Sequence, residues 1–440
     1  MGYSAAGVMQ PPDSPSGDAV ASVPVAAADP YAVLRNRDYV LFLIGRLVAV
    51  LGQQMAVVAV GWEIYERTRS ALALGLVGLT QMLPMVLCTL PAGHVADNYE
   101  RKRIILVTTG VIALASLGLM LVSLVQGPVF WIYVCLFLAG VGRTFLWPAS
   151  AAFVPHLVPR HLFSRAVTWN SGTFHLASVA GPAAGGAVIA LTHSAATVYA
   201  LHGLATLTCL TLVALIRRKH VAATKEKMTP ASLLTGFRFV FAQRVILGTI
   251  TLDLFAVLLG GSVALLPVYA KDILRVGPTG LGLLQAAMPI GAVLCALVLA
   301  HRPPLQRAGR AMLWAVALFG AATIGFGLSR EFVLSFLLLL VCGAADNVSV
   351  VVRHTLVQLL TPDEKRGRVS AVNSLFIGTS NELGGFESGA VAHWFGPALG
   401  HTVATGATIS VVSGGVGTIL VVLAVAWLWP ELRRYGRLDV

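Results

Sequence analysis

The sequence predicts an all-α membrane protein in which twelve transmembrane helices form two related halves. Of the 440 residues, 57% are apolar and 11% are charged, whereas ordinary soluble domains carry about 25% charged residues. A soluble fold has no interior large enough to bury that much apolar surface. The mean hydropathy of +0.80 leaves room for roughly a dozen spans of about 20 residues each.

Apolar runs of spanning length occur in two groups of six, separated by a polar, basic stretch. The first group covers residues 40–61, 71–95, 104–125, 129–154, 166–191 and 195–216. The second group covers residues 245–270, 279–300, 311–328, 332–358, 369–395 and 404–429. An even number of spans places both ends of the chain on the same side of the membrane.

Basic residues test this map, because the cytoplasmic loops of membrane proteins are enriched in Lys and Arg. Of the 31 Lys and Arg residues, 23 fall on the side that carries both ends and five on the opposite side, while Arg46, Arg143 and Arg353 lie within spans. The asymmetry predicts that both termini are cytoplasmic. It also accounts for the net charge of +12 without nucleic acid as a partner.

The same map divides the chain into five parts. Residues 1–34 are rich in Ala, Pro, Ser and Val and are expected to form a disordered cytoplasmic tail. Residues 35–216 form an N-terminal six-helix bundle, and residues 245–430 form a C-terminal one. The cytoplasmic linker 217–244 contains an amphipathic stretch, residues 232–245, that is expected to lie on the membrane surface. Residues 431–440 form a second tail.

The two halves resemble each other in sequence, which is the pattern expected of an internal duplication. Shifting the fourth and fifth spans by 203 positions superimposes them on the tenth and eleventh. The matched pairs include Gly140 with Gly343, Pro159 with Pro362, Arg165 with Arg368, Asn170 with Asn373, Gly181 with Gly384, and Gly186 with Gly389. Many secondary transporters are built from such repeats around a binding site near the middle of the membrane.

The loop after the second span reads GHVADNYERKR. Gly93 is expected to close the helix, Asp97 follows four residues later, and Arg101 and Lys102 begin a basic cluster. The loop resembles the G-x-x-x-D-R/K-x-G-R-K motif of the major facilitator superfamily, except that Asn98 and Glu100 replace a base and a glycine. The resemblance implies that Asp97 and Arg101 hold the two halves together at the cytoplasmic side when the protein faces outward.

A second motif lies in the fifth span, which reads SVAGPAAGGAV. Gly181, Pro182, Gly185 and Gly186 resemble the G-P-x-x-G-G motif that the superfamily associates with exporters and antiporters. Small residues permit close contact between membrane helices, and a proline permits a bend.

Three longer segments resemble the enterobactin-exporter-like branch of the superfamily over about residues 35–430. They are SLLTGFRF, LDLFAVLLGGSVALLPVYA and TPDEKRGRVSAVNSLFIG. The resemblance implies the major facilitator fold and proton-driven export of a siderophore, or of drug-like molecules as in close relatives. It also implies that the first, fourth, seventh and tenth helices line a central cavity.

Charged residues within the membrane are costly and therefore mark candidate functional sites. Arg143 in the fourth span and Asp346 in the tenth occupy equivalent positions under the shift of 203. They are expected to face each other across the cavity and to form an ion pair, either in one state of the transport cycle only or as a permanent structural pair. Asp346 and Glu382, which lies near the middle of the eleventh span, are the first choices for proton coupling.

Other polar residues of the spans are weaker candidates. Asp253 and Arg46 lie toward the cytoplasmic ends of the seventh and first spans, where they can also extend to the interface. Glu387 lies five residues after Glu382, so the two point about 140° apart on a helix. Gln53, with its neighbour Gln54, is placed to form hydrogen bonds with a substrate. Among the histidines, His175 and His393 lie within or at the end of spans.

Several classes of chemistry lack support in the sequence. There is no G-x-x-x-x-G-K-[ST] loop, H-E-x-x-H pair or G-x-S-x-G elbow, so the chain is not expected to be an enzyme or an ATP-driven pump. The five cysteines lie in apolar runs without paired spacing, which predicts neither disulfides nor a metal site. No cofactor is expected, and the energy source is the proton gradient.

The sequence therefore predicts a monomeric transporter of an inner or plasma membrane that exports a small organic solute, with a siderophore as the first choice, in exchange for protons. Its partners are the solute, protons and the lipid bilayer. A multidrug efflux antiporter of the same fold is the first alternative. A membrane receptor is a remote alternative, because no loop is long enough to form a folded domain outside the membrane.

Overall fold

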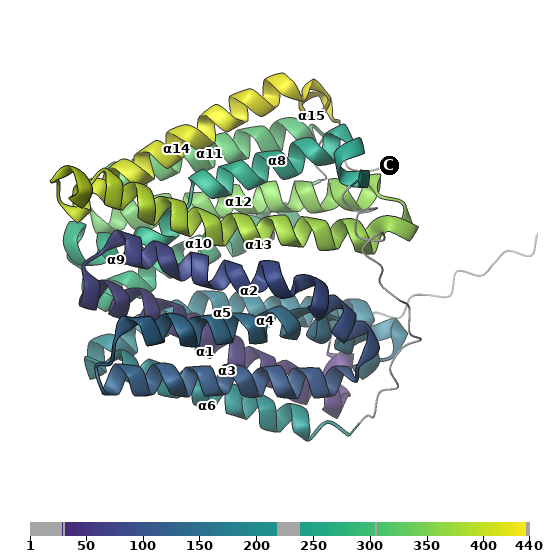
Figure 1. Cartoon of the computed structure of the whole chain (residues 1–440). Helices are drawn as coiled ribbons and strands as arrows, with labels where there is room; N and C mark the ends of the chain where they lie inside the picture. Colours follow the sequence, from purple (N-terminus) through teal and green to yellow (C-terminus); the bar gives the residue numbers. More distant parts are fainter. Residues whose placement is uncertain (1–28, 30, 218–237, 304–305, 437–440) are drawn as a thin grey trace, which may run out of the picture.

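The computed structural model describes residues 29, 31–217, 238–303 and 306–436, and within these ranges the chain is helical and contains no strand (Figure 1). Eleven of the described helical segments are long and apolar enough to cross a membrane. A twelfth long helix, α13 (Asp363–Trp394), packs against α2, α8 and α14. The predicted all-α membrane fold is confirmed.

The first half contains six long helices, each of which begins and ends close to an expected apolar run. They are α1 (Arg37–Thr68), α2 (Ala71–Asn98), α3 (Arg101–Leu124), α4 (Val129–Leu157), α5 (Phe163–Thr192) and α6 (Ala195–Ala214). Side-chain caps fix two of the beginnings, since Asn36 accepts from the Tyr39 amide and Ser70 from the Ala73 amide.

The second half repeats this arrangement with more irregularity. Its long helices are α8 (Arg244–Leu259), α10 (Gly277–Ala300), α11 (Ala308–Leu328), α12 (Phe332–Leu360), α13 and α14 (Val403–Leu428). Short helices lie between and after them: η3 (Ser262–Leu265), α9 (Leu266–Val268), η4 (Tyr269–Ile273), η5 (Pro397–Leu399) and α15 (Pro430–Arg434).

The seventh span differs from the single continuous helix that its apolar run, 245–270, suggests. α8 ends at Leu259, and Gly260 and Gly261 lead into η3, α9 and the π-helix η4. The break allows close approach, because a Cβ at Gly261 would lie 2.9 Å from the Ser388 Oγ and closer still to the Gly384 carbonyl group. Hydropathy alone does not reveal such a break, since the residues on both sides are apolar.

Two segments expected to be tails contribute ordered structure. Residues Ala32–Arg35 form the 3-10 helix η1, and Val33 is buried against the first half. In α15, Leu432 is buried. The Glu431 carboxyl accepts hydrogen bonds from the Glu431 backbone and from the Arg244 side chain, and these hydrogen bonds lower its pKa. Residues 1–28 and 30 of the expected N-terminal tail and residues 232–237 of the amphipathic stretch 232–245 lie outside the described residues. Within the described part of that stretch, residues 238–242 are helical.

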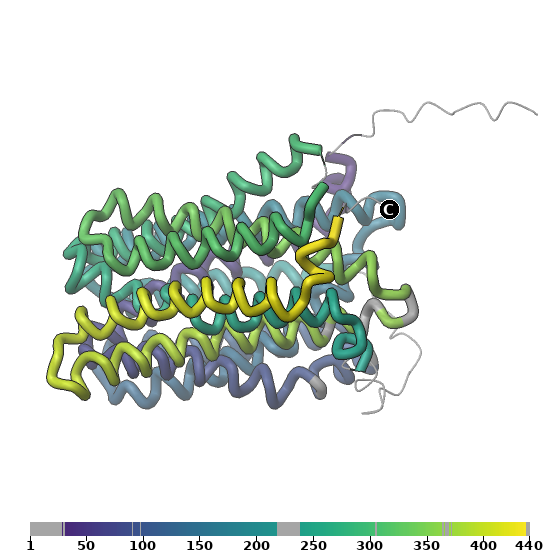
Figure 2. Tube along the Cα trace, turned by 90° about the horizontal axis from the view of Figure 1, so that it is seen from above, coloured from purple at the N-terminus to yellow at the C-terminus, as the bar shows by residue number. Residues whose placement is uncertain are grey.

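Each half is a bundle, and the two bundles meet along two pairs of helices, α2 with α13 and α5 with α10. Figures 1 and 2 show the long helices running side by side between two ends of the molecule. We call the end that carries Arg37 and α15 the terminal end, and the opposite end, which carries α9, the far end. Both helix pairs cross at glycines: Gly75 lies against Gly389, and Gly186 lies against Gly282.

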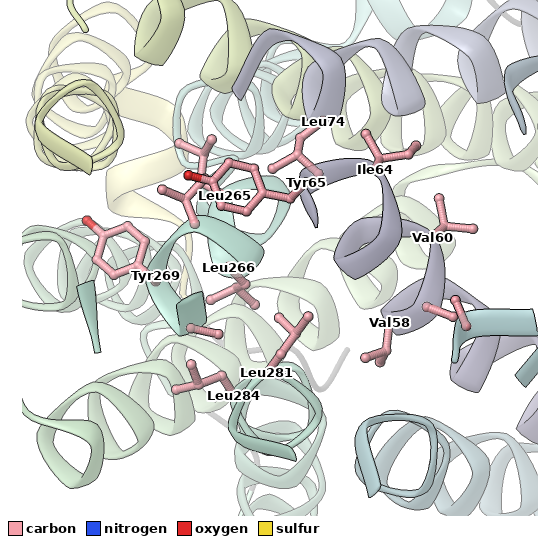
Figure 3. Packing of buried hydrophobic residues seen from close by; sticks show 14 of the residues in the cluster. Val58, Val60, Ile64, Tyr65, Leu74, Leu265, Leu266, Tyr269, Leu281 and Leu284 are labelled. Carbon is pink, nitrogen blue, oxygen red and sulfur yellow. The ribbon is translucent and has the colours of Figure 1, made fainter. Parts of the chain in front are cut away.

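The buried apolar side chains show where the bundles are closed. One large cluster joins both halves at the far end, where Tyr65 and Leu74 of the first half lie near Leu265 of the second (Figure 3). The clusters described at the terminal end each belong to a single half. The bundles are therefore sealed together by an apolar core at the far end.

Candidate functional site

A cavity of about 480 Å³ lies between the two bundles. This volume is within the range of about 300–1,000 Å³ that is typical of small-molecule sites. The first, fourth, seventh and tenth spans contribute to its wall, as the family resemblance implies, and so do α2, α3, α6, α10 and α13. The wall combines apolar side chains with a limited set of charged and amide groups.

Three charged residues reach the cavity wall: Arg143 from α4, Asp346 from α12 and Glu382 from α13. The Arg143 guanidinium donates a hydrogen bond to the Gln81 side-chain oxygen on α2. Glu382 lies within electrostatic range of Arg143. The site therefore holds two carboxyl groups and one guanidinium, contributed by both bundles.

Gly78 on α2 allows α13 to approach closely, which places Glu382 on the same cavity wall as Arg143. A Cβ at Gly78 would overlap the backbone of Glu382, so only a glycine permits the observed approach. Gln81 follows one turn later on α2 and points at Arg143. The position of Glu382 thus depends on backbone packing between the halves.

Asp346 shares the cavity with Arg143, but the ion pair expected between them is not formed in this structure. Arg143 binds Gln81, on a helix of its own bundle. The shift of 203 identifies equivalent depths along two spans, whereas a contact also requires that the two side chains turn toward each other. The structure therefore pairs Arg143 with Gln81 by a hydrogen bond, and Glu382 and Asp346 line the same cavity without an ion pair to Arg143.

Five carboxamides also reach the cavity, and only the two on α1 were expected from the sequence. The five are Gln53, Gln54, Gln81, Gln285 and Asn381. Gln81 accepts from Arg143, and Asn381 donates to the Ile377 carbonyl at 2.8 Å. Each carboxamide has both donor and acceptor atoms, so the wall can form hydrogen bonds of either direction with a solute.

His202 on α6 is a further cavity residue that the sequence analysis did not select. Its Nδ1 lies 2.9 Å from the Ser116 Oγ on α3, and both residues line the wall. The signal was present, since His202 is the only strongly polar side chain near the middle of its apolar run. The two histidines named as candidates from the sequence, His175 and His393, do not line the cavity.

Other charged residues of the spans lie away from the cavity wall. Asp253 on α8 forms a buried ion pair with Arg353 on α12, within the second bundle. The Arg46 guanidinium lies 5.7 Å from the centre of the Trp147 ring. Glu387 accepts a hydrogen bond of 3.4 Å from the Ser388 hydroxyl and is not among the residues that line the cavity.

The loop motif after the second span is only partly described. α2 continues to Asn98, so Gly93 does not end the helix as expected, and the side chain of Asp97 lies outside the described residues. Arg101 contacts His156 of α4. Lys102 donates to the Ala214 and Ile216 carbonyls at 2.9 and 2.6 Å, which satisfies the C-terminal end of α6.

The glycines of the fifth span contact two different helices. A Cβ at Gly181 would meet Leu51 and Gln54, and a Cβ at Gly185 would lie 2.8 Å from Met55 Cα, so both seat α5 against α1. Gly186 faces the other bundle, where its Cβ would lie 3.1 Å from Gly282 Cα. Pro182 is buried within the same helix, which continues through it.

Comparison with known proteins agrees with this architecture. The family model described as "Transmembrane secretion effector" matches residues 28–426. The chain is 28% identical to the enterobactin exporter EntS of Citrobacter koseri over 398 residues, which covers 89% of this chain and 92% of the relative. It is also 28% identical to the enterobactin exporter EntS of Shigella flexneri over 400 residues, with the same coverage.

Solved transporter structures share the fold at low sequence identity. A bacterial homolog of the human lysosomal transporter Spinster, in an inward-facing and occupied conformation, matches with a TM-score of 0.72 and 15% identity, covering 91% of this chain and 99% of that one. A POT family transporter matches with a TM-score of 0.71 and 12% identity, covering 90% and 96%. The major facilitator fold, with two six-helix bundles, is thereby confirmed. The chain belongs to the transmembrane secretion effector family and is a multi-pass membrane transporter, not an enzyme.

Proposed function

We propose that the protein exports a small organic solute, most specifically a siderophore, across the inner membrane in exchange for protons. The observation that carries the proposal is the cavity between the bundles, with its two carboxyl groups and one guanidinium. Such a site can bind a solute and a proton alternately. The similarity to enterobactin exporters supports siderophore export as the direction and the class of solute.

The distribution of basic residues supports a cytoplasmic location for the terminal end. With this orientation, the apolar seal at the far end closes the cavity toward the outside. The structure then corresponds to an inward-facing state that accepts solute from the cytoplasm. Export requires a second state in which the far end opens and the terminal end closes.

The solute and the proton compete for the same carboxyl groups, and this competition couples the movement of one to the movement of the other. A deprotonated Glu382 or Asp346 accepts hydrogen bonds from hydroxyl groups of the solute, whereas a protonated carboxyl has lost its charge and much of its acceptor strength. A proton that enters from outside therefore displaces the solute, and release of that proton to the cytoplasm restores the binding site. Arg143 and the carboxamides orient the solute in both steps.

Multidrug efflux is the second candidate function, and the charge of the cavity favours it. Two carboxyl groups against one guanidinium give the wall an excess of acidic groups, which suits lipophilic cations. The same carboxyl groups would then bind the drug directly. The two functions differ in the solutes that are transported, so one experiment separates them.

The test uses inverted membrane vesicles with an acidic interior, which accumulate a solute that this protein normally exports. A catecholate siderophore and a lipophilic cationic dye are offered separately. Siderophore uptake that collapses with the pH gradient and is lost in Glu382→Gln supports the proposal. Glu331→Gln is the matched control, because Glu331 is exposed at the start of α12 and lies outside the cavity wall.

The other outcomes are equally decisive. Uptake of the dye alone replaces siderophore export with multidrug efflux. Siderophore uptake that is unaffected by the pH gradient contradicts proton exchange, and movement of neither compound contradicts both assignments of the solute.

A further inference from the structure

Charged residues join the two bundles at the far end, on the outer side of the apolar seal. Glu66 and Arg69 come from the end of α1, and Lys271 and Asp272 come from η4 of the other bundle. Lys271 forms an ion pair with Glu66, and Arg69 Nη1 lies 3.4 Å from Asp272 Oδ1. Both ion pairs therefore cross from one half of the molecule to the other.

Tyr65 completes the group, because its hydroxyl donates a hydrogen bond to Asp272 Oδ2. The Tyr65 ring is buried beside Leu265, as Figure 3 shows, so this residue belongs to both the charged layer and the apolar seal beneath it. We call Tyr65, Glu66, Arg69, Lys271 and Asp272 the far-end latch. It contains two acids and two bases, and each acid contacts a base of the other bundle.

The local backbone supports this arrangement on both sides. Arg69, at the C-cap of α1, has φ 50°, in the left-handed region that costs a non-glycine residue free energy. Lys271 and Asp272 lie in a π-helix, a rare element that often occurs at functional sites. The Lys271 Nζ also lies 5.3 Å from the centre of the Trp62 ring, and its side chain is only 16% exposed.

We propose that the far-end latch sets the balance between the inward-facing and outward-facing states. Its contacts join α1 to η4 across the bundle interface, so they exist only while the far end is closed. Opening the far end separates Asp272 from Tyr65 and Arg69, and Lys271 from Glu66. The latch therefore stabilises the inward-facing state selectively, and weakening it moves the population outward.

This inference rests on alternating access, part of the proposed function, but it does not depend on the identity of the solute or on proton coupling. The test therefore measures the conformation and not transport. Spin labels on His193→Cys and His401→Cys report the distance between the bundles at the far end, and labels on Arg160→Cys and His301→Cys report it at the terminal end. All four positions are exposed.

Two native cysteines that are only partly buried, Cys88 and Cys295, are changed to Ser before labelling, while the other three are buried. The main variant combines Lys271→Gln with Asp272→Asn. We expect about a tenfold rise in its ratio of outward-facing to inward-facing molecules, with longer far-end distances and shorter terminal-end distances.

Exchanging the charges in Glu66→Lys with Lys271→Glu restores one ion pair and is expected to return the wild-type distribution. Arg244→Gln is the matched control, since it removes an exposed ion pair with Glu431 inside a single bundle. Tyr65→Phe removes only one hydroxyl and serves as a second variant should the main one fold poorly. Unchanged distances in both latch variants, or an equal shift in Arg244→Gln, would overturn the inference. A result of either kind is independent of whether a siderophore is transported.

Discussion

The crossing of Gly389 on α13 with Gly75 on α2 provides a sharp test of how the bundles move. A Cβ added at Gly389 would lie 2.6 Å from the Ala71 carbonyl oxygen and 2.7 Å from Gly75 Cα, whereas ordinary contacts begin near 3.4 Å. Gly389→Ala therefore forces the helices apart by about 0.8 Å, the difference between the shortest of these distances and an ordinary contact.

The free-energy cost follows from the overpacking. One extra methyl group in a tight contact costs about 1–3 kcal/mol, and this cost corresponds to about a 5- to 150-fold change in a conformational ratio. The crossing lies at the sealed far end, so the cost falls on the state in which this end is closed, which is the inward-facing state in the proposed cycle. Gly389→Ala is expected to shift the population toward the outward-facing state by a factor in this range.

Spin labels at His193→Cys and His401→Cys measure the shift as a longer far-end distance. Gly110→Ala is the control, because a Cβ there meets only Leu210 Cδ1, at 3.7 Å. The same distance distribution in Gly389→Ala and in Gly110→Ala, with equal thermal stability, would refute the reasoning. A loss of thermal stability without a longer distance would also contradict it, because the crossing would then support the fold in every state.

Three further predictions concern charged residues. Arg353→Gln leaves Asp253 buried and unpaired, which is expected to lower the free energy of unfolding by about 3–5 kcal/mol; thermal unfolding in detergent measures this, and an unchanged transition contradicts it. Glu382→Gln is expected to reduce uptake that depends on the pH gradient by at least about tenfold, whereas Glu387→Gln changes this uptake by less than about twofold. Equal losses in the two variants would contradict the idea that uptake depends on the carboxyl group in the cavity wall. Lys102→Ala removes a positive charge from the C-terminal end of α6 and is expected to lower stability by about 0.3–1 kcal/mol, which the same unfolding measurement detects as a small decrease.

Much of the fold follows from hydropathy and charge. A membrane helix must hide its backbone polar groups from lipid, so the apolar runs locate the long helices to within a few residues. The break after Leu259 was not predicted, because it depends on Gly261 meeting the backbone of α13. A contact between distant segments leaves no periodic pattern in the sequence.

The site was predicted in part for a related reason. A charged side chain within the membrane costs free energy, so Arg143, Asp346 and Glu382 were candidates for the site, and all three reach the cavity. Their partners were not evident, since depth along a span does not determine which neighbour a side chain faces. Arg143 binds Gln81, and Asp253 binds Arg353, which the sequence analysis counted only as a charge within a span.

Proton movement measured in proteoliposomes tests the central claim most directly. Purified protein is reconstituted with a pH-sensitive dye inside the vesicles, and a gradient of catecholate siderophore is imposed without a pH gradient. Proton exchange predicts that siderophore movement changes the internal pH, with protons moving opposite to the siderophore, and that Glu382→Gln abolishes this change. Siderophore movement without any change of internal pH would contradict the account.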